Sequence, residues 1–406
     1  MLLETRIQRL LENIGRRNAL PLRVRLWNGH TVDLAPAPRV AITLPRPSAA
    51  RYFLKPDLST LGKAVVEGHI EVEGPVREII RVGEGLARVA PGTSVPRFWR
   101  PRRRHSRRLD ADAIAYHYDV SNEFYGLWLD REMVYSCAYF PSGEEDIHTA
   151  QARKLDHICR KLMLRPGEKL LDIGCGWGAL IRWAARHYGV HATGITLSRN
   201  QYDLATERIR ADALEGRCRV LLQDYRDHPG EGVYDKIASV GMFEHVGLRN
   251  LPGYFGVIRR LLKQGGMVMN HGITAVDADS RWVGLGAGEF IERYVFPHGE
   301  LPHLSLVVRE MSAQGLEVVD VESLRRHYAR TCQLWAERLE AAHLDARAMA
   351  GERRYRIWLL YLAGCAHAFE HNWVSIHQVL GTRTPADGRS VQPWSRAHLY
   401  AGTGTG

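Results

Sequence analysis

The stretch EKLLDIGCGWGALIRWAARHYG, residues 168–189, decides the fold. It begins as a short apolar strand, turns through three alternating glycines, Gly174, Gly176 and Gly178, and continues with apolar residues at helical spacing. Glycines at a strand-to-helix turn remove side chains and let the backbone approach a ligand closely. The stretch therefore predicts an α/β sheet with a ligand-binding turn after one of its strands.

Strand-like and helix-like segments continue to alternate after this turn. In order they are VHATGIT, SRNQYDLATERIRADAL, CRVLLQD, YDKIASV, LPGYFGVIRRLLKQGG and GMVMNHGI. This alternation is typical of an α/β sheet. Ser198 followed by Gln201 has the spacing of a capping box, so we predict that a helix begins there.

The glycine spacing alone permits other interpretations. Gly174, Gly176 and Ala179 satisfy the GxGxxA pattern of dinucleotide-binding proteins. The acid expected about 20 residues later, which would bind a ribose, is missing because the next strand ends in GITLS. A nicotinamide cofactor is therefore disfavoured. A second alternative is that the glycines serve only to pack the helix against the strand. Three alternating glycines directly after Asp172 make that alternative less favoured.

The segment before residue 96 predicts a small α+β domain. An amphipathic helix, LLETRIQRLLENI, is followed by strand-like LRVRLWNGHTVDLA, RVAITL and HIEVEG, with a turn at Asn28 and Gly29. The run VPRFWRPRRRHSRR follows, and it reads either as a solvated tether or as a phosphate-binding arm. We predict a small domain over 1–95, a basic linker over 96–112, a catalytic domain over 113–392 and a tail over 393–406.

Composition narrows the class of protein. The 406 residues are 45% hydrophobic, enough for a large core in more than one compact unit, and the net charge of +10 favours a polyanionic partner, either nucleic acid or anionic lipid. The six cysteines form no CxxC pair, which argues against a zinc cage or a disulfide framework, so we expect no metal and a reducing cytosol. The N-terminus does not read as a secretory signal, and the apolar tract 357–369 is too short to span a bilayer.

Seven motifs occur in order along the chain: HYDVSNEFYGLWLD with MVYSCAYF, then LDIGCGWGA, GITLSRNQ, VGMFEHVG, NHGI and HYARTCQLW. Together they resemble the motifs of one family, the cyclopropane-fatty-acyl-phospholipid synthases. The resemblance extends from about residue 113 to the tail. Because shorter relatives that act on mycolic acids begin near the catalytic domain, residues 1–95 favour the phospholipid branch.

The resemblance implies a class I S-adenosylmethionine-dependent methyltransferase fold, Rossmann-like with a seven-stranded sheet. It also implies two sets of site residues. The predicted cofactor contacts are Tyr135, Ser136, Gly174, Gly176, Thr196, Gln201, Asp224 and Tyr225, the last two beside the adenine. A bicarbonate ion, the implied base, would be held by Cys137, Glu244, His271, Ile273 and Tyr328.

The resemblance also implies roles within the second set. Glu244 would accept the hydroxyl proton of bicarbonate, His271 and Tyr328 would donate hydrogen bonds, and Cys137 and Ile273 would supply backbone groups. His245 lacks a match and is expected to position the loop. Taken singly, core packing explains most of these residues as well; their joint occurrence within the motifs favours the site.

The implied reaction transfers the methyl of S-adenosylmethionine to a cis double bond of a phospholipid acyl chain and closes a cyclopropane ring. The motifs leave open a methyl-branched or methylene product and a small-molecule amine N-methyltransferase. A non-enzymatic lipid-binding protein would be expected to have lost site residues, and none is lost. The segment 275–305 is a candidate lid, where Trp282, Tyr294 and Phe296 either stabilise a cation or pack in a core.

The expected partners follow from the same implied reaction. They are an anionic phospholipid membrane surface and an unsaturated phospholipid substrate, which place the protein in the cytoplasm at the inner face of the membrane. Nucleic acid is not expected, because no NPPY-like motif for base methylation is present. The oligomeric state is left open, with a homodimer as one alternative.

Overall fold

The protein is described by a computed structural model that covers residues 2–54, 56–89, 121–279, 284–297 and 299–400. Contacts divide the chain into two compact units. Of the described residues, one unit contains 2–54, 56–89, 284–297 and 332–371, and the other contains 121–279, 299–331 and 372–400. The predicted boundaries near residues 95 and 112 fall in 90–120, outside the described residues, and so does the whole basic linker 96–112.

The larger unit is built on a seven-stranded sheet in the order β10-β11-β9-β8-β5-β6-β7. Its strands are β5 (Lys169–Ile173), β6 (His191–Thr196), β7 (Cys218–Leu222), β8 (Tyr234–Val240), β9 (Leu262–Ala275), β10 (Glu317–Ser323) and β11 (Val374–Thr382). The first five are parallel; β11 pairs antiparallel with β9, and β10 pairs antiparallel with β11 at the edge of the sheet. The predicted class I methyltransferase fold is confirmed.

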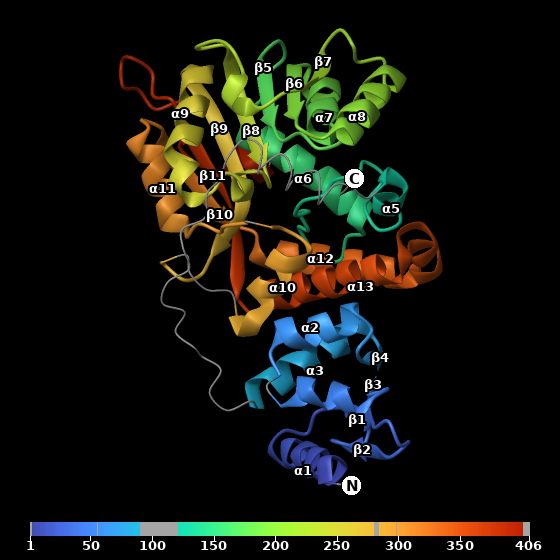
Figure 1. The fold of residues 1–406 in the computed structure, drawn as a ribbon. Coiled ribbons are helices and arrows are strands. Elements are labelled where there is room, and N and C mark those ends of the chain that lie inside the picture. Colours follow the sequence, from blue (N-terminus) through green and yellow to red (C-terminus); the bar gives the residue numbers. More distant parts are fainter. Residues whose placement is uncertain (1, 55, 90–120, 280–283, 298, 401–406) are drawn as a thin grey trace. The chain divides into compact units, whose positions relative to one another are not determined.

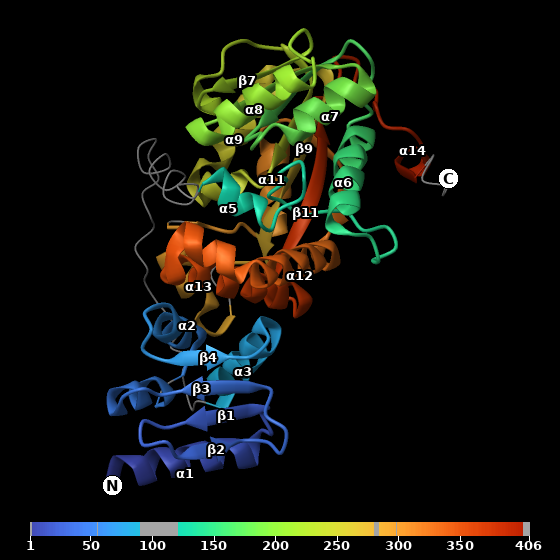
Figure 2. The same ribbon diagram turned by 90° about the vertical axis from the view of Figure 1, so that its right-hand side faces the viewer.

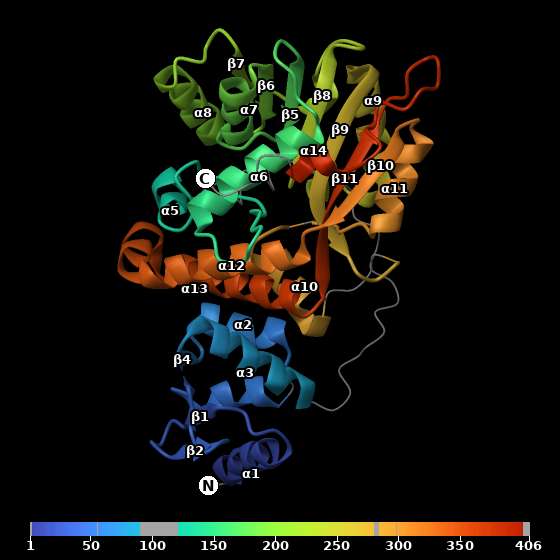
Figure 3. The ribbon, with the colours of Figure 1, turned by 180° about the vertical axis from the view of Figure 1, so that it is seen from behind.

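Helices cover both faces of this sheet (Figures 1 and 3). On one face lie α6 (Ile147–Lys161), α7 (Ala179–Tyr188) and α8 (Arg199–Ala211), and on the other lie α9 (Leu251–Leu261) and α11 (Leu304–Ala313). Neighbouring residues of β5 divide between the two cores: Leu170 packs with the first group and Leu171 with the second. Because both faces are covered, the strands read as continuous apolar runs in the sequence.

Local sequence fixes where the helices near the site begin. The Ser198 side chain accepts a hydrogen bond from the Gln201 N–H at 3.3 Å, which confirms the predicted start of α8. Asp146 caps α6 by accepting from the N–H groups of His148 and Thr149. Gly178, with a φ of 81°, occupies the left-handed conformation that starts α7.

The smaller unit contains the predicted N-terminal α+β fold (Figure 2). Its elements are α1 (Leu2–Arg17), β1 (Leu22–Arg25), β2 (Thr31–Asp33), β3 (Val40–Thr43), α2 (Leu58–Val66), β4 (Glu71–Glu73) and α3 (Val76–Val89), with the sheet ordered β2-β1-β3-β4. Later parts of the chain join it: α10 (Ala287–Tyr294), the end of α12 (Arg325–Ala341) and α13 (His343–Glu370). Helix α13 packs against α3 and α2.

The candidate lid over 275–305 is only partly described. Trp282 lies outside the described residues. In the smaller unit, the Tyr294 hydroxyl donates to Glu67 Oε1 at 3.0 Å, and the ring of Phe296 packs edge-on against Tyr361. These contacts give both rings a packing role, and a role beside a cation stays a prediction. Among the described helices, none is both long and apolar enough to cross a membrane.

Candidate functional site

A cavity lies at the carboxyl ends of β5, β6 and β8 in the larger unit. All eight residues predicted to contact the cofactor line it: Tyr135, Ser136, Gly174, Gly176, Thr196, Gln201, Asp224 and Tyr225. The same cavity is lined by His245, which had been expected only to position its loop. In open parallel sheets, ligands bind at this edge, so the cavity stands where the fold requires a cofactor site.

Gly174 and Gly176 of the turn after β5 line the cavity. Gly174 has a φ of 80°, and a Cβ on it would lie 2.9 Å from the side chain of Met242. Gly176 has a φ of 55°, and a Cβ there would meet no atom within 4 Å. The first glycine is therefore required by close packing, and the second leaves open space in which a ligand can lie against the backbone.

The end of β6 and the start of α8 supply polar groups to the cavity. The Thr196 hydroxyl donates to Gln201 Oε1 at 2.7 Å and accepts from the Ser198 N–H at 3.1 Å. Since Oε1 is engaged, the Nε2 amide of Gln201 is the group it offers to a ligand. On the next loop, both carboxylate oxygens of Asp224 accept from the Arg226 guanidinium, which fixes the carboxylate in place.

Two buried polar residues of α6 hold the loop that carries Tyr135 and Ser136. Gln151 Nε2 donates to the Ser136 carbonyl at 2.9 Å, and Lys154 Nζ donates to the Ser136 hydroxyl at 2.9 Å. Burial lowers the pKa of Lys154 to about 8, an effect opposed by Asp130, and burial raises the pKa of Asp172 to about 7. Gln151 and Lys154 were not predicted from the sequence, although polar residues three apart on the core face of a helix were a usable signal.

Glu244 lies in the short 3₁₀ helix η3 (Phe243–His245) directly after β8. Strand β8 ends at Val240, paired with His271, so the N–H of Ile273 on β9 has no strand partner there. Glu244 Oε1 accepts from that N–H at 2.7 Å. Its Oε2 is buried with no hydrogen-bond partner among the described residues, and burial raises the pKa of Glu244 to about 7.

His271 points from β9 toward its cross-strand neighbour Gln378 on β11. The Gln378 amide donates to His271 Nδ1 at 3.0 Å, so the ring proton is on Nε2. That Nε2 is buried and has no partner within the described part of the chain. Burial lowers the pKa of His271, which keeps the ring neutral with one N–H to donate. Gln378 was not predicted from the sequence.

Cys137 and Tyr328 meet at the carbonyl of Leu324. Cys137 Sγ lies 3.8 Å from that oxygen, and the Tyr328 N–H donates to it at 3.0 Å. The Leu324 N–H in turn donates to the carbonyl oxygen of Ile376 on β11, and Ile376 lies opposite Ile273 on β9. Burial raises the pKa of the Cys137 thiol, so the group stays protonated and does not act as a nucleophile.

The structure thus places the predicted residues in two groups. The cofactor group lines one cavity. The other five are connected through β9, β11 and Leu324, and none of them lines that cavity. Two unpartnered buried groups of opposite hydrogen-bonding character, Glu244 Oε2 and His271 Nε2, leave the second group incomplete. Glu244 Oε2 can accept a hydrogen bond, and His271 Nε2–H can donate one.

Comparison with known proteins identifies the family of the chain. The family model described as Mycolic acid cyclopropane synthetase matches residues 105–379, and a domain of unknown function matches residues 9–85. A probable fatty acid methyltransferase of Pseudomonas putida is 51% identical over 381 residues, which are 94% of this chain and 96% of that protein.

Two further relatives match the larger part of the chain. The cyclopropane-fatty-acyl-phospholipid synthase of Escherichia coli (strain K12) is 38% identical over 68% of this chain and 69% of its own length. The crystal structure of the mycolic acid cyclopropane synthase CmaA1 complexed with SAH and CTAB superposes with a TM-score of 0.64 and 34% identity, over 67% of this chain and 98% of that one.

Proposed function

The chain belongs to the mycolic acid cyclopropane synthetase family of S-adenosylmethionine-dependent methyltransferases, and from that premise we propose that it methylates a cis double bond of a phospholipid acyl chain and closes a cyclopropane ring. The observation that carries the proposal is the pair of buried unpartnered groups, Glu244 Oε2 and His271 Nε2. Methylation of an amine or a hydroxyl releases its proton from a polar nitrogen or oxygen, so it needs no base beside an apolar acyl chain.

The cavity residues fit the cofactor. S-adenosylmethionine supplies the methyl group when it is bound. Gly174 and Gly176 would leave the backbone open to it, Gln201 would offer its side-chain amide, and Asp224, fixed by Arg226, would contact it beside the adenine. Ser136 is oriented by Lys154, which makes Lys154 a positioning residue. Similarity to a protein whose structure was solved with SAH supports this assignment.

The second group fits bicarbonate. Glu244 Oε2 would accept the hydroxyl proton of the ion, and His271 Nε2–H would donate to one of its oxygens. The ion would serve as a base that is not permanently alkylated. Gln378 fixes which nitrogen of His271 carries the proton. Because the Cys137 thiol stays protonated, it does not compete as a nucleophile for the methyl group.

The chemistry of an isolated alkene explains this requirement for a base. The π pair forms a new carbon–carbon bond to the methyl group as the methyl–sulfur bond breaks, and a carbocation remains on the chain. Loss of one proton from the added methyl group lets its electron pair close the ring, so no oxidant or reductant is consumed. The base must therefore stand beside a dry apolar path.

A second product has a specific observation in its favour. The relative at 51% identity is named a probable fatty acid methyltransferase, a name that does not require a ring. Loss of the proton with a hydride shift along the acyl chain gives a methylene group from the same two substrates. A saturated methyl branch needs an added hydride donor, which makes it the less direct alternative.

The membrane is the proposed partner, because the acyl substrate lies there. The net charge of +10 includes the basic run over 96–112, and each basic residue near an anionic surface contributes about 1 kcal/mol of attraction. We expect peripheral binding at the inner face of the cytoplasmic membrane, in a monomer or a homodimer, and no nucleic-acid partner. Binding to anionic vesicles should fall as salt is raised, and salt-independent binding would contradict the electrostatic part of the proposal.

The test is incubation of unsaturated anionic phospholipid vesicles with the protein and S-adenosylmethionine whose methyl is fully deuterated, followed by mass spectrometry of the fatty acids. A ring or a methylene group retains two deuterons, and a methyl branch retains three. Proton resonance separates the first two, since only the methylene product has vinylic signals in unlabelled samples. A lipid product without a ring would remove the ring-closing step and leave the methyl transfer. Absence of any lipid product from protein that binds the cofactor would overturn the proposal.

A further inference from the structure

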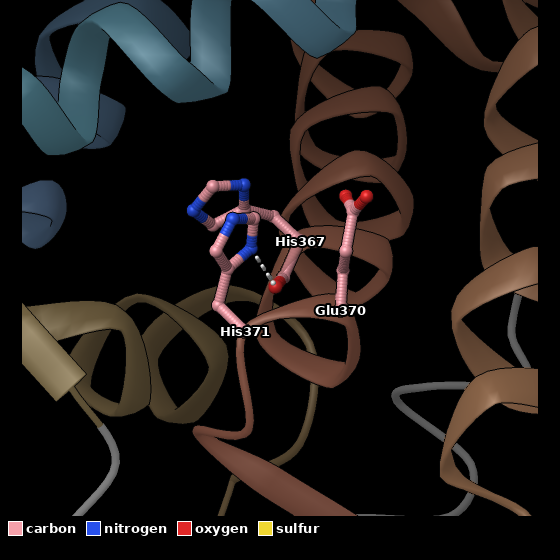
Figure 4. Close-up of side chains that lie close together, drawn as sticks. All are labelled: His367, Glu370 and His371. Carbon is pink, nitrogen blue, oxygen red and sulfur yellow. Dashed lines mark hydrogen bonds between the residues drawn. The ribbon is translucent and has the colours of Figure 1, made fainter.

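The polar side chains at the end of α13 are engaged with one another and with α3 (Figure 4). His367 Nε2 donates to Glu84 on α3 at 2.7 Å, and Arg77 donates to Glu370 at 3.0 Å. The imidazoles of His367 and His371 stack with their centroids 4.0 Å apart. This cluster joins α13 to α3 within the smaller unit, so its role is packing.

A cleft in the larger unit, by contrast, has polar groups without partners. It lies at the end of β9 and the start of β11, beside helix α11, and it shares no lining residue with the cofactor cavity. We propose that this cleft binds the phosphate group of a glycerophospholipid. The choice of a lipid rests on the proposed function, because the lipid would be the substrate whose acyl chain is methylated.

Ser375 on β11 is the buried polar group of the cleft. It pairs with Thr274 across the sheet and is only 9% exposed. Its hydroxyl lines the cleft and has no hydrogen-bond partner among the described residues. Buried hydroxyls are normally hydrogen-bonded, so a ligand oxygen that accepts from Ser375 would complete the site.

His377 lines the cleft on the same face of β11 as Ser375. Its Nδ1 lies 2.9 Å from the hydroxyl of Thr274, which is buried. Within the described part of the chain that hydroxyl has no other partner, so it donates its proton to Nδ1 rather than leave it unbonded. The ring proton of His377 is then on Nε2, which is left to donate to a ligand.

The remaining polar side chains of the cleft also suit an anion. Arg309 on α11 donates through Nε and one terminal nitrogen to Glu310, at 3.0 and 2.7 Å. A guanidinium has five N–H groups, so others remain for a phosphate oxygen. Asn372, just before β11, adds a side-chain amide, and no carboxylate is among the lining residues. The cleft therefore offers donors and no negative charge.

Apolar side chains beside these donors favour an amphiphile over a free anion. Val276, Leu304 and Val308 line the same cleft, and Val276 is 41% exposed. Inorganic phosphate would leave this apolar surface in water. The glycerol backbone and first methylene groups of a lipid would cover it, which is favourable.

The cleft also reaches the strand that carries the second group of site residues. Ala275, the last residue of β9, lines the cleft and lies two residues beyond Ile273. Side chains alternate along a strand, so Ala275 shares a face with Ile273 and His271. Thr274 and its cross-strand neighbour Ser375 face the other side. A lipid held by its phosphate would therefore pass its acyl chain round the end of β9.

The experiment is a calorimetric titration of the full-length protein with dihexanoyl phosphatidylglycerol below its micelle concentration, and separately with inorganic phosphate. Burial of two methylene groups should make the lipid bind about tenfold more tightly than phosphate. Ser375→Ala should weaken lipid binding about threefold to tenfold, and Arg309→Gln about tenfold, through loss of one hydrogen bond each. Ser390→Ala and Arg210→Gln, both at exposed positions outside the cleft, are the matched controls.

Three results would overturn the proposal. They are no saturable binding of the lipid in the millimolar range, binding that is unchanged in both Ser375→Ala and Arg309→Gln, and inorganic phosphate that binds as tightly as the lipid, which would make this a site for free phosphate. Circular dichroism checks that each variant keeps the fold. Because the saturated lipid has no double bond to methylate, its binding is read independently of product formation, and failure here is distinguishable from failure of the proposed function.

Discussion

Replacing Glu244 with glutamine should stabilise the protein at alkaline pH while abolishing product formation. Burial raises the pKa of Glu244 from 4.5 to about 7 in the folded chain. A raised carboxyl pKa means that the folded state favours the protonated form, so stability is highest at low pH and falls as pH rises from the unfolded pKa to the folded one. Glutamine does not ionise and escapes that loss.

The size of the effect follows from the two pKa values. Ionisation of Glu244 costs the folded state about 1 kcal/mol at pH 5.5 and about 3 kcal/mol at pH 8. The variant should therefore gain about 2 kcal/mol over the wild type between these pH values. The amide oxygen can still accept from the Ile273 N–H, the bond that Glu244 Oε1 makes at 2.7 Å.

Urea denaturation followed by circular dichroism at both pH values would measure this gain, which corresponds to a midpoint shift of roughly 1 M. Glu207→Gln, at an exposed position of α8, should show no such change with pH. Identical pH dependence of stability in wild type and Glu244→Gln would refute the claim that this carboxyl is buried and titrates near neutrality. A variant with full activity would refute its role as the proton acceptor.

Three further predictions concern the positioning of the two sites. Lys154→Met should weaken binding of S-adenosylmethionine about tenfold by calorimetry, through loss of one charged hydrogen bond, whereas Lys169→Met at an exposed position should leave binding unchanged. Gly174→Ala should lower stability by about 1 to 2 kcal/mol and weaken cofactor binding, and a thermally unchanged variant would contradict the packing argument. Gln378→Leu should reduce turnover about tenfold and leave cofactor affinity unchanged, because the ring proton of His271 is then no longer held on Nε2. An equal loss of turnover and of cofactor affinity would indicate a structural defect instead.

The sequence predicted the parallel part of the sheet because its signals are local. Apolar runs, glycine turns and the cap at Ser198 each act over a few residues, and the strands and the α8 start agree with them. Strands β10 and β11 were not found from the pattern of the chain itself. Strand β10 pairs with β11, and β11 pairs with β9, across large sequence separations; such pairing leaves no signal within a short window.

The two sites differ in how well the sequence revealed them. Every predicted cofactor residue lines one cavity, since strand ends of a parallel sheet converge by topology. Gln378 was missed because its role shows only once its partner His271 is known, whereas Gln151 and Lys154 were missed although their spacing on the core face of a helix was a usable signal.

The end of strand β8 links the fold to the chemistry of the second group of residues. Because β8 stops two residues short of Ile273 on its neighbour β9, one backbone donor is left for a side chain to satisfy, and Glu244 satisfies it with a single oxygen. The other oxygen and the N–H of His271 stay buried without partners among the described residues. Unpaired buried groups cost about 1 to 3 kcal/mol each, so a protein selected for stability alone would remove them. A ligand that accepts from His271 and donates to Glu244 would offset this cost, and a base held in this way can take a proton from a methylated chain without itself being joined to it.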